Sequence, residues 1–171
     1  MPATMENAYI GLGSNLDDPQ AQVEAGLRAL AGLPRSRLLR WSRLYRSAPW
    51  GDVDQPDFIN AVALIETMLA PTELLHELLA IERRAGRERH ARRWGPRVLD
   101  LDILVFGDRR IDEPGLRLPH PRLSERAFVL VPLADVEPHL AVPGCGSVGQ
   151  LLAAVDATSC CPLEPAAGAA I

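Results

Sequence analysis

Two aspartates one residue apart, Asp100 and Asp102, are the side chains in this sequence best suited to hold a metal ion. They lie in the apolar stretch Leu99 to Phe106, whose alternation predicts a β-strand. Successive side chains of a strand point to opposite faces, so both aspartates share one face, roughly 6 to 7 Å apart. Carboxylates at that spacing can converge on hard divalent cations. The opposite face is expected to carry the aliphatic side chains Leu99, Leu101, Ile103 and Val105.

Arginines crowd the segment just before this strand. Seven of the 18 arginines fall between residues 83 and 97, and Glu88 is the one acidic residue among them. A turn at Gly95-Pro96 leads into the strand. Taken alone, the aspartates would suit a half-buried strand with two solvated carboxylates. The neighbouring cations favour a different interpretation, a polyphosphate held together with Mg²⁺.

The chain contains no lysine, which restricts how it can handle phosphate. A Walker A loop needs a lysine, a protein-kinase-type site needs a strand lysine, and Schiff-base catalysis needs an amine. These three kinds of site are therefore excluded. Phosphate must be held by arginine guanidinium groups, backbone amides and metal.

Composition indicates one globular domain spanning residues 1–171, with 47% hydrophobic and 23% charged residues. No apolar run approaches the length of a membrane span, and no signal-peptide pattern opens the chain. Three cysteines, Cys145, Cys160 and Cys161, have the spacing of neither a disulfide framework nor a metal site, which indicates a reducing cytoplasm. The net charge of −4 argues against a general nucleic-acid binder.

Hydrophobic periodicity predicts an α+β fold with a ferredoxin-like βαββαβ core. A strand over 8–12 is followed by a helix that begins at the Asp17-Asp18-Pro19 cap and ends before Gly32. Strands over 38–46 and 58–68 come next, then a helix from Pro71 to near Gly86, and then the strand that carries the aspartates. This order predicts a mainly antiparallel sheet with both crossover helices on one face.

The C-terminal third is expected to cover the other face of the sheet, so that helices pack on both faces. Ser124 is a candidate cap for a short helix that ends at Val131, and Ser147 precedes a helix expected over 148–155. The Ala/Gly-rich tail at 165–171 is expected to be disordered.

An aromatic ring and an amide share one face of the strand over 58–68. Phe58 and Asn60 follow a Pro/Gly/Asp-rich loop over 47–57. A flat heterocycle could stack on the phenyl ring while the amide donates and accepts hydrogen bonds along its edge. A core phenylalanine beside an incidental asparagine is the equally weighted alternative.

Three further side chains have two open interpretations each. His120, between two prolines, and Arg126 could contact phosphate or ribose, or the histidine could simply belong to a structural turn. Trp94 could stack on a substrate or pack under the arginine-rich segment.

Four motifs occur in order at the spacing of a known family. They are AYIGLGSNL at 8–16, QPDFINA at 55–61, RWGPRVLDLDI at 93–103 and LPHP at 118–121. Together they closely resemble the 6-hydroxymethyl-7,8-dihydropterin pyrophosphokinases of the folate pathway. The likeness spans roughly residues 8 to 140, and the 93–103 motif is highly specific to that family.

The resemblance implies that the chain transfers the β,γ-diphosphate of ATP to the 6-hydroxymethyl oxygen of the pterin and releases AMP. It further implies that Asp100 and Asp102 hold two Mg²⁺ ions that bridge the triphosphate. The catalytic residues implied in this way are Arg87, Arg93, Arg97, Asp100 and Asp102.

The same resemblance assigns residues to each substrate. The pterin would stack between Phe58 and Phe128, and Trp94 would close over the site. The implied pterin-binding set is Ser47, Ala48, Trp50, Phe58, Asn60, Trp94 and Phe128. The implied ATP-binding set is Glu82, Arg89, Arg93, Arg97, Ile103, Arg117, His120 and Arg126. Gly115 and Pro121 replace a basic and an aromatic residue near the nucleotide.

Two rival functions stay open at this stage. A metal-dependent phosphohydrolase would use water in place of the pterin alcohol. An RNA-binding module on a ferredoxin-like sheet would need aromatic residues in an RNP-like pattern, and the expected strands carry scattered ones. The expected partners are ATP and the pterin, with no nucleic acid and no membrane, and the protein is expected to be a monomer.

Overall fold

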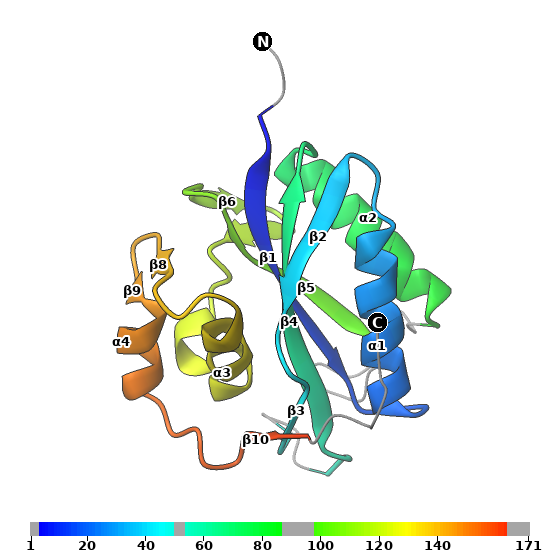
Figure 1. Cartoon of the computed structure of the whole chain (residues 1–171), viewed down its shortest axis with the longest axis vertical. Helices are drawn as coiled ribbons and strands as arrows, with labels where there is room; N and C mark the ends of the chain where they lie inside the picture. Colours follow the sequence, from blue (N-terminus) through cyan, green and yellow to red (C-terminus); the bar gives the residue numbers. More distant parts are fainter. Residues whose placement is uncertain (1–3, 50–53, 87–97, 164–171) are drawn as a thin grey trace.

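The computed structural model describes residues 4–49, 54–86 and 98–163 (Figure 1). The first part of the chain forms β1 (Glu6–Ser14), α1 (Pro19–Ala31), β2 (Ser36–Trp41), β3 (Tyr45–Ser47), β4 (Phe58–Thr67), α2 (Pro71–Arg84) and β5 (Asp100–Phe106). The predicted βαββαβ order is confirmed, with the second strand divided into β2 and β3. The later elements are β6 (Ile111–Glu113), β7 (Leu116–Leu118), a 3-10 helix η1 (Leu123–Glu125), α3 (Ala127–Val136), β8 (Ala141–Val142), β9 (Gly146–Ser147), α4 (Val148–Ala153) and β10 (Cys161–Pro162).

The main sheet has the strand order β10-β3-β4-β1-β5. β2 lies on the same side of β4 as β3 and pairs with the later part of that strand. All of its pairings are antiparallel. β1 and β4 lie in the middle, while β5 forms one edge. The predicted antiparallel sheet is therefore confirmed, and it places the aspartate-bearing strand at an edge.

The second strand is divided because a serine replaces a backbone partner. We expected one strand over 38–46, but pairing stops after Trp41 and resumes at Tyr45. Between them Ser42 Oγ accepts a hydrogen bond from the backbone N–H of Val62 at 2.9 Å. Side-chain hydrogen bonds of this kind compete with regular ladder pairing.

Helices cover both faces of the sheet, as predicted (Figure 1). α1 and α2 lie on one face, over a core that contains the odd-numbered apolar side chains of β4 and Leu101, Ile103 and Phe106 of β5. α3 and α4 lie on the other face, over a second core that contains Val62 and Leu64 of β4. Among the described residues, no helix has both the length and the apolar content needed to cross a membrane.

One residue of β5 departs from the predicted alternation. Leu99, Leu101 and Ile103 pack under α1 and α2 as expected, but Val105 packs in the core under α3. The cause is a β-bulge, because Ile10 pairs with Ile103 while Tyr9 pairs with Val105. The extra residue, Leu104, inverts the side-chain alternation from Val105 onward. The bulge follows the aspartates, so both still share one face.

The C-terminal helices differ from the prediction at their ends. The helix expected between Ser124 and Val131 is a 3-10 turn followed by α3, which continues through Pro132 to Val136. α4 begins after Ser147 as predicted and ends at Ala153. Ser147 Oγ accepts from Gln150 N at 3.2 Å, which is the expected cap. The tail at 165–171 lies outside the described residues.

Candidate functional site

The two aspartates point away from the α1–α2 core, on the face that α3 partly covers. Asp100 pairs with Gly13 of β1, and Asp102 pairs with Gly11. Directly paired residues of an antiparallel ladder share a face. Because both partners are glycines, β1 contributes no side chain beside either carboxylate. The surface next to the aspartates is therefore low enough to receive a ligand.

The edge strand β5 is held from outside by two hydrogen bonds. The buried carboxylate of Glu82, on α2, accepts from Leu101 N at 2.8 Å, between the two aspartates. The backbone N–H of His120 donates to the carbonyl of Leu104 at 2.8 Å. We expected Glu82 to contact the nucleotide, and the structure shows this additional contact to the strand. These bonds fix the register of the aspartates relative to α2 and to the segment around His120.

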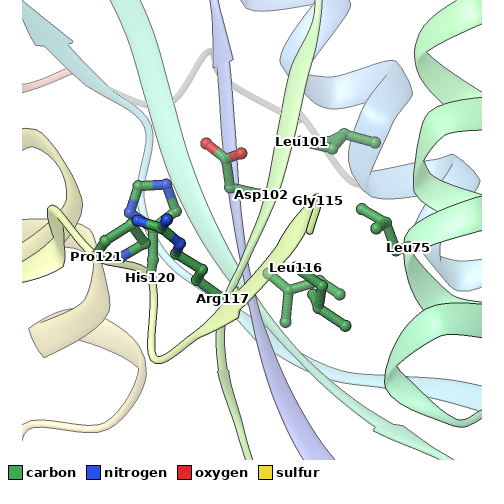
Figure 2. A pocket seen from close by; sticks show the side chains of 9 residues that line it. Leu75, Leu101, Asp102, Gly115, Leu116, Arg117, His120 and Pro121 are labelled. Carbon is green, nitrogen blue, oxygen red and sulfur yellow. The ribbon is translucent and has the colours of Figure 1, made fainter. Parts of the chain in front are cut away.

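A cavity of about 400 Å³ opens at this edge of β5 (Figure 2). Leu75, Leu101 and Leu116 lie on one side of it, and Asp102, Arg117, His120 and Pro121 lie on the other. It therefore joins an apolar surface to cationic and carboxylate groups, a combination that suits a nucleotide. Its lining is Leu75, Leu101, Asp102, Ile103, Gly115, Leu116, Arg117, His120 and Pro121.

His120 is a neutral imidazole at neutral pH. Burial and, after it, the positive charge of Arg126 lower the pKa of His120 to about 4, although Asp100 opposes the shift. Its Nδ1 accepts a hydrogen bond from Arg122 N at 3.2 Å. This bond favours the tautomer with hydrogen on Nε2, which can donate to an anionic or polar ligand.

Arg126 brings the start of α3 to the aspartates. Burial lowers its pKa, and the charges of Asp102 and Asp100 act in the opposite direction. Its guanidinium carbon lies 5.5 Å from the centre of the Phe128 ring. The structure thus brings Arg126 and Phe128 to the same side of the sheet as Asp100 and Asp102.

Asn60 lies across β1 from Asp100, since both pair with Gly13. Its Nδ2 donates to Ser47 Oγ at 2.6 Å. A Cβ placed on Gly13 would lie 3.2 Å from Asn60 Oδ1, so the carbonyl end of the amide faces the aspartates. Phe58, half-buried, is two residues along the same strand face. Two strand spacings separate Asn60 from Asp100, about 10 Å.

Ala48, another predicted pterin contact, follows β3 and is exposed. The remaining members of the predicted sets lie outside the described residues: Trp50, Arg87, Arg89, Arg93, Trp94 and Arg97. Their assigned contacts stay predictions.

Two features of the site could not be identified from sequence patterns. The leucines at 75, 101 and 116 line the cavity, although helical and strand periodicity marks them simply as core. Asn15 is buried, and its Nδ2 donates to Gln55 Oε1 at 2.9 Å and to the Pro56 carbonyl at 3.0 Å. This pair of bonds ties the end of β1 to the segment that leads into Phe58. The AYIGLGSNL and QPDFINA motifs, which contain these residues, are the available signal.

The chain resembles known proteins over most of its length. A family model described as 7,8-dihydro-6-hydroxymethylpterin-pyrophosphokinase (HPPK) matches residues 9–138. The chain is 49% identical over 160 residues to the 2-amino-4-hydroxy-6-hydroxymethyldihydropteridine pyrophosphokinase of Pseudomonas aeruginosa, covering 94% of each chain. It is 46% identical over 148 residues to the protein of the same name from Haemophilus influenzae, covering 86% of this chain and 92% of that one.

The fold is also found among solved structures. The crystal structure of Plasmodium falciparum HPPK-DHPS wild type with pteroate matches with a TM-score of 0.69 at 14% identity. The match covers 88% of this chain but 42% of the longer one, so the chain spans less than half of that protein. At this identity the likeness shows the fold. The family match and the two bacterial relatives show more, namely that this chain belongs to the 7,8-dihydro-6-hydroxymethylpterin-pyrophosphokinase family.

Proposed function

We propose that this enzyme transfers diphosphate from ATP to the hydroxymethyl group of 6-hydroxymethyl-7,8-dihydropterin and releases AMP, as a step of folate biosynthesis. The family match and the names of the relatives support the reaction. One structural observation supports it most directly. Asp100 and Asp102 lie between a cavity at the outer edge of β5 and the Phe58–Asn60 surface of β4. A transferase needs two substrates that meet at a centre able to neutralise charge.

The cavity is the proposed ATP site. The apolar side chains would cover the purine ring, while Arg117 and the Nε2–H of His120 would contact ribose or phosphate oxygens. Gly115 and Pro121 also line the cavity, and both are residues at which this chain departs from the family pattern. Gly115 itself contributes no cation to the wall of the cavity.

The aspartates suit Mg²⁺ shared with a triphosphate. Among the described residues, no group of three or more His, Cys, Asp or Glu side chains could form a complete metal cage. Mg²⁺ commonly uses one or two carboxylates together with substrate phosphates and water. A pair of carboxylates on one strand face fits that pattern. When bound there, Mg²⁺ would withdraw electron density from the phosphates and neutralise their charge.

Phe58, Asn60 and Phe128 form the proposed pterin site. The Nδ2 of Asn60 is engaged by Ser47, which leaves its Oδ1 directed toward the aspartate side. That oxygen can accept from an N–H on the edge of a pterin, while the two phenyl rings cover its faces. A pterin held here would direct its hydroxymethyl group toward Asp100 and Asp102.

The protein's own side chains then need to orient the two substrates and neutralise the charge on the phosphates. Phosphoryl-type transfer depends on in-line positioning and on stabilising charge more than on covalent help. Arg126 is placed to approach phosphate oxygens near the aspartates. The arginines at 87, 89, 93 and 97 are proposed to supply further cations, as the family resemblance implies.

Nucleotide products distinguish this proposal from its enzyme rival. The purified protein would be mixed with ATP, Mg²⁺ and 6-hydroxymethyl-7,8-dihydropterin, and the nucleotides separated by chromatography. We expect AMP to form in equal amount to the pterin diphosphate and to depend on the pterin. Release of ADP and phosphate without pterin would support the phosphohydrolase and contradict the proposal. Cytoplasmic location, a monomeric state and the absence of nucleic-acid partners stay predictions.

Removing either proposed pterin contact should weaken the binding of the pterin but not that of ATP. Phe58→Ala and Asn60→Ala are each expected to weaken pterin binding, and loss of the Phe58 stack should cost about 1–3 kcal/mol, by analogy with base–aromatic stacking. Affinity for a non-hydrolysable ATP analogue should change little, because the cavity lies beyond β5. Calorimetry with each ligand separately measures both affinities. Equal losses for the two ligands would show that these residues support the fold rather than the pterin.

A further inference from the structure

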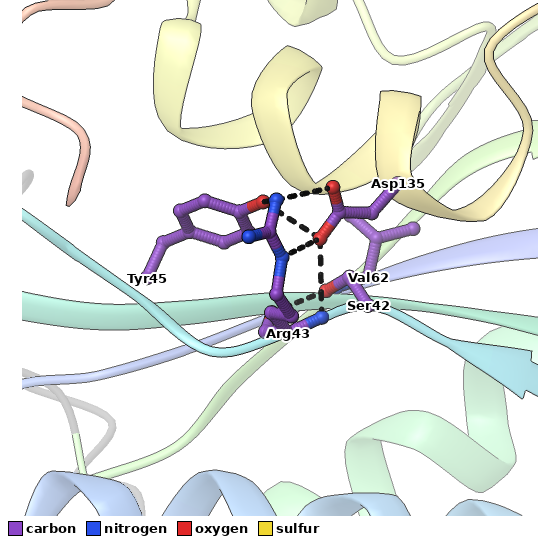
Figure 3. A network of polar contacts seen from close by, with 5 residues as sticks. All are labelled: Ser42, Arg43, Tyr45, Val62 and Asp135. Carbon is purple, nitrogen blue, oxygen red and sulfur yellow. Dashed lines mark hydrogen bonds and ion pairs between the residues drawn. The ribbon is translucent and has the colours of Figure 1, made fainter. Parts of the chain in front are cut away.

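A polar network ties the last turn of α3 to β3 (Figure 3). The hydroxyl of Tyr45 donates to Asp135 Oδ2 at 2.6 Å. Arg43 donates to the same carboxylate through Nε and Nη2, each at 3.1 Å, and through its backbone N–H at 3.2 Å. Arg43 Nη2 also donates to the Tyr45 hydroxyl oxygen at 2.9 Å. We call these three residues the Tyr45–Asp135 clamp.

Burial makes the tyrosine the stronger anchor of the clamp. Tyr45 is 2% exposed, whereas the Arg43 side chain is 61% exposed. Exposed ion pairs contribute little, while a buried hydrogen bond to a charged group contributes more. Burial and the hydrogen bond to Asp135 raise the pKa of Tyr45 to about 12, so the hydroxyl stays a donor. Burial of Asp135 acts to raise its pKa, but the hydrogen bonds from Arg43 and Tyr45 outweigh this and lower it.

The clamp lies beside the proposed pterin site. Tyr45 is the direct partner of Asn60 in the ladder between β3 and β4. Asp135 follows Phe128 by seven residues, which is about two helical turns and returns to the same helix face. The clamp therefore joins the strand pair that carries Phe58 and Asn60 to the helix that carries Phe128.

α3 crosses the sheet between the two edges of the site. At its start, the charge of Arg126 interacts electrostatically with those of Asp100 and Asp102 on β5. In its last turn, Asp135 is bonded to Tyr45 on β3. Pro132 lies between them and cannot donate to the carbonyl of Phe128, so the helix lacks one of its own stiffening bonds. External anchors at both ends then matter more for the position of Phe128.

We propose that the Tyr45–Asp135 clamp is a positioning device that sets the separation between Phe128 and the Phe58–Asn60 surface, and so the affinity for the pterin. This inference depends on the proposed function. None of the three clamp residues is expected to touch a substrate. A ring stacked between two aromatic faces needs a defined gap, because van der Waals attraction falls steeply when a gap widens by even 0.5–1 Å.

Tyr45→Phe is the sharpest test, because it deletes one oxygen and keeps the buried ring. We expect the dissociation constant for 6-hydroxymethyl-7,8-dihydropterin to rise about tenfold, close to the lower end of the effect of losing a hydrogen bond to a charged group. Affinity for a non-hydrolysable ATP analogue should stay within about twofold. Asp135→Asn, which weakens the contact with Arg43 as well, should show the same selectivity. Calorimetry gives both affinities, and thermal unfolding gives the stability of each variant.

A matched control uses the same helix. Glu137, at the end of α3, pairs with Arg40 of β2 at 2.9 Å. Glu137→Gln removes that ion pair, which is not adjacent to Asn60, and should leave pterin affinity unchanged. Pterin affinity that is equal in wild type and Tyr45→Phe would overturn the inference, even if Tyr45→Phe is less stable. An equal loss of affinity for the pterin and for the ATP analogue in Tyr45→Phe would overturn it too. A wild-type protein that binds no pterin would instead contradict the proposed function itself.

Discussion

Asp102→Ala and Asp100→Ala are each expected to lower the turnover number by at least about 10²–10³-fold, the range for loss of one preorganised charge-stabilising group. Each change removes one of the two carboxylates proposed to share Mg²⁺ with the triphosphate. The fold should survive, because both side chains point away from the α1–α2 core. Steady-state AMP formation at several Mg²⁺ concentrations measures the loss. If a variant needs a higher Mg²⁺ concentration than the unmodified protein for half-maximal activity, the lost activity is due to weaker metal binding.

Asp108→Ala is the matched control for this pair. Asp108 is exposed and lies just after the end of β5 that is far from the two aspartates. The substitution therefore removes the same charge without changing the site. Its turnover should equal that of the unmodified protein. If a folded Asp102→Ala variant also turned over normally, the assignment of these aspartates to the metal would be wrong.

Gly13→Val is expected to abolish most activity without unfolding the protein. A Cβ at this position would already lie 3.2 Å from Asn60 Oδ1 and 3.9 Å from Phe58 Cδ1, and the two methyl groups of valine would extend further into the site. They would occupy the space between Asn60 and Asp100, where the hydroxymethyl group is proposed to lie. We expect kcat/KM for the pterin to fall about 10²-fold or more, as misplacement of a reactant by 1 Å can cause.

Stability should respond differently to the same change. Valine suits a strand better than glycine, so the free energy of unfolding should stay within about 1 kcal/mol of its original value. Chemical denaturation measures that free energy, and binding of an ATP analogue serves as the internal control. Normal pterin turnover in Gly13→Val would mean that the substrates meet elsewhere.

Strand periodicity explains why the central part of the site could be predicted. Alternation in 99–103 places both aspartates on one face, and alternation in β4 does the same for Phe58 and Asn60. Antiparallel pairing through Gly13 then aligns the two pairs. The alternation within each strand can be derived from local sequence, whereas the register that aligns the two pairs through Gly13 is known from the structure.

Other features depend on contacts that local sequence does not encode. The bulge that turns Val105 toward α3 is a mismatch between two strands distant in sequence. The interruption of the second strand at Ser42 depends on the opposite residue, Val62. Similarly, Tyr45 and Asp135 are 90 residues apart, and no pattern in either segment indicates that they meet.

The bonds that Glu82 and His120 make to β5 also bear on self-association. An edge strand with open N–H and C=O groups can pair with a strand of another molecule and start aggregation. Here Leu101 N–H is bonded to a side chain of α2, and the Leu104 carbonyl is bonded to the segment after β7. A second molecule would have to break both bonds before it could extend the sheet at this edge. The contacts that align the aspartates therefore also protect the substrate-facing edge of the sheet from strand addition.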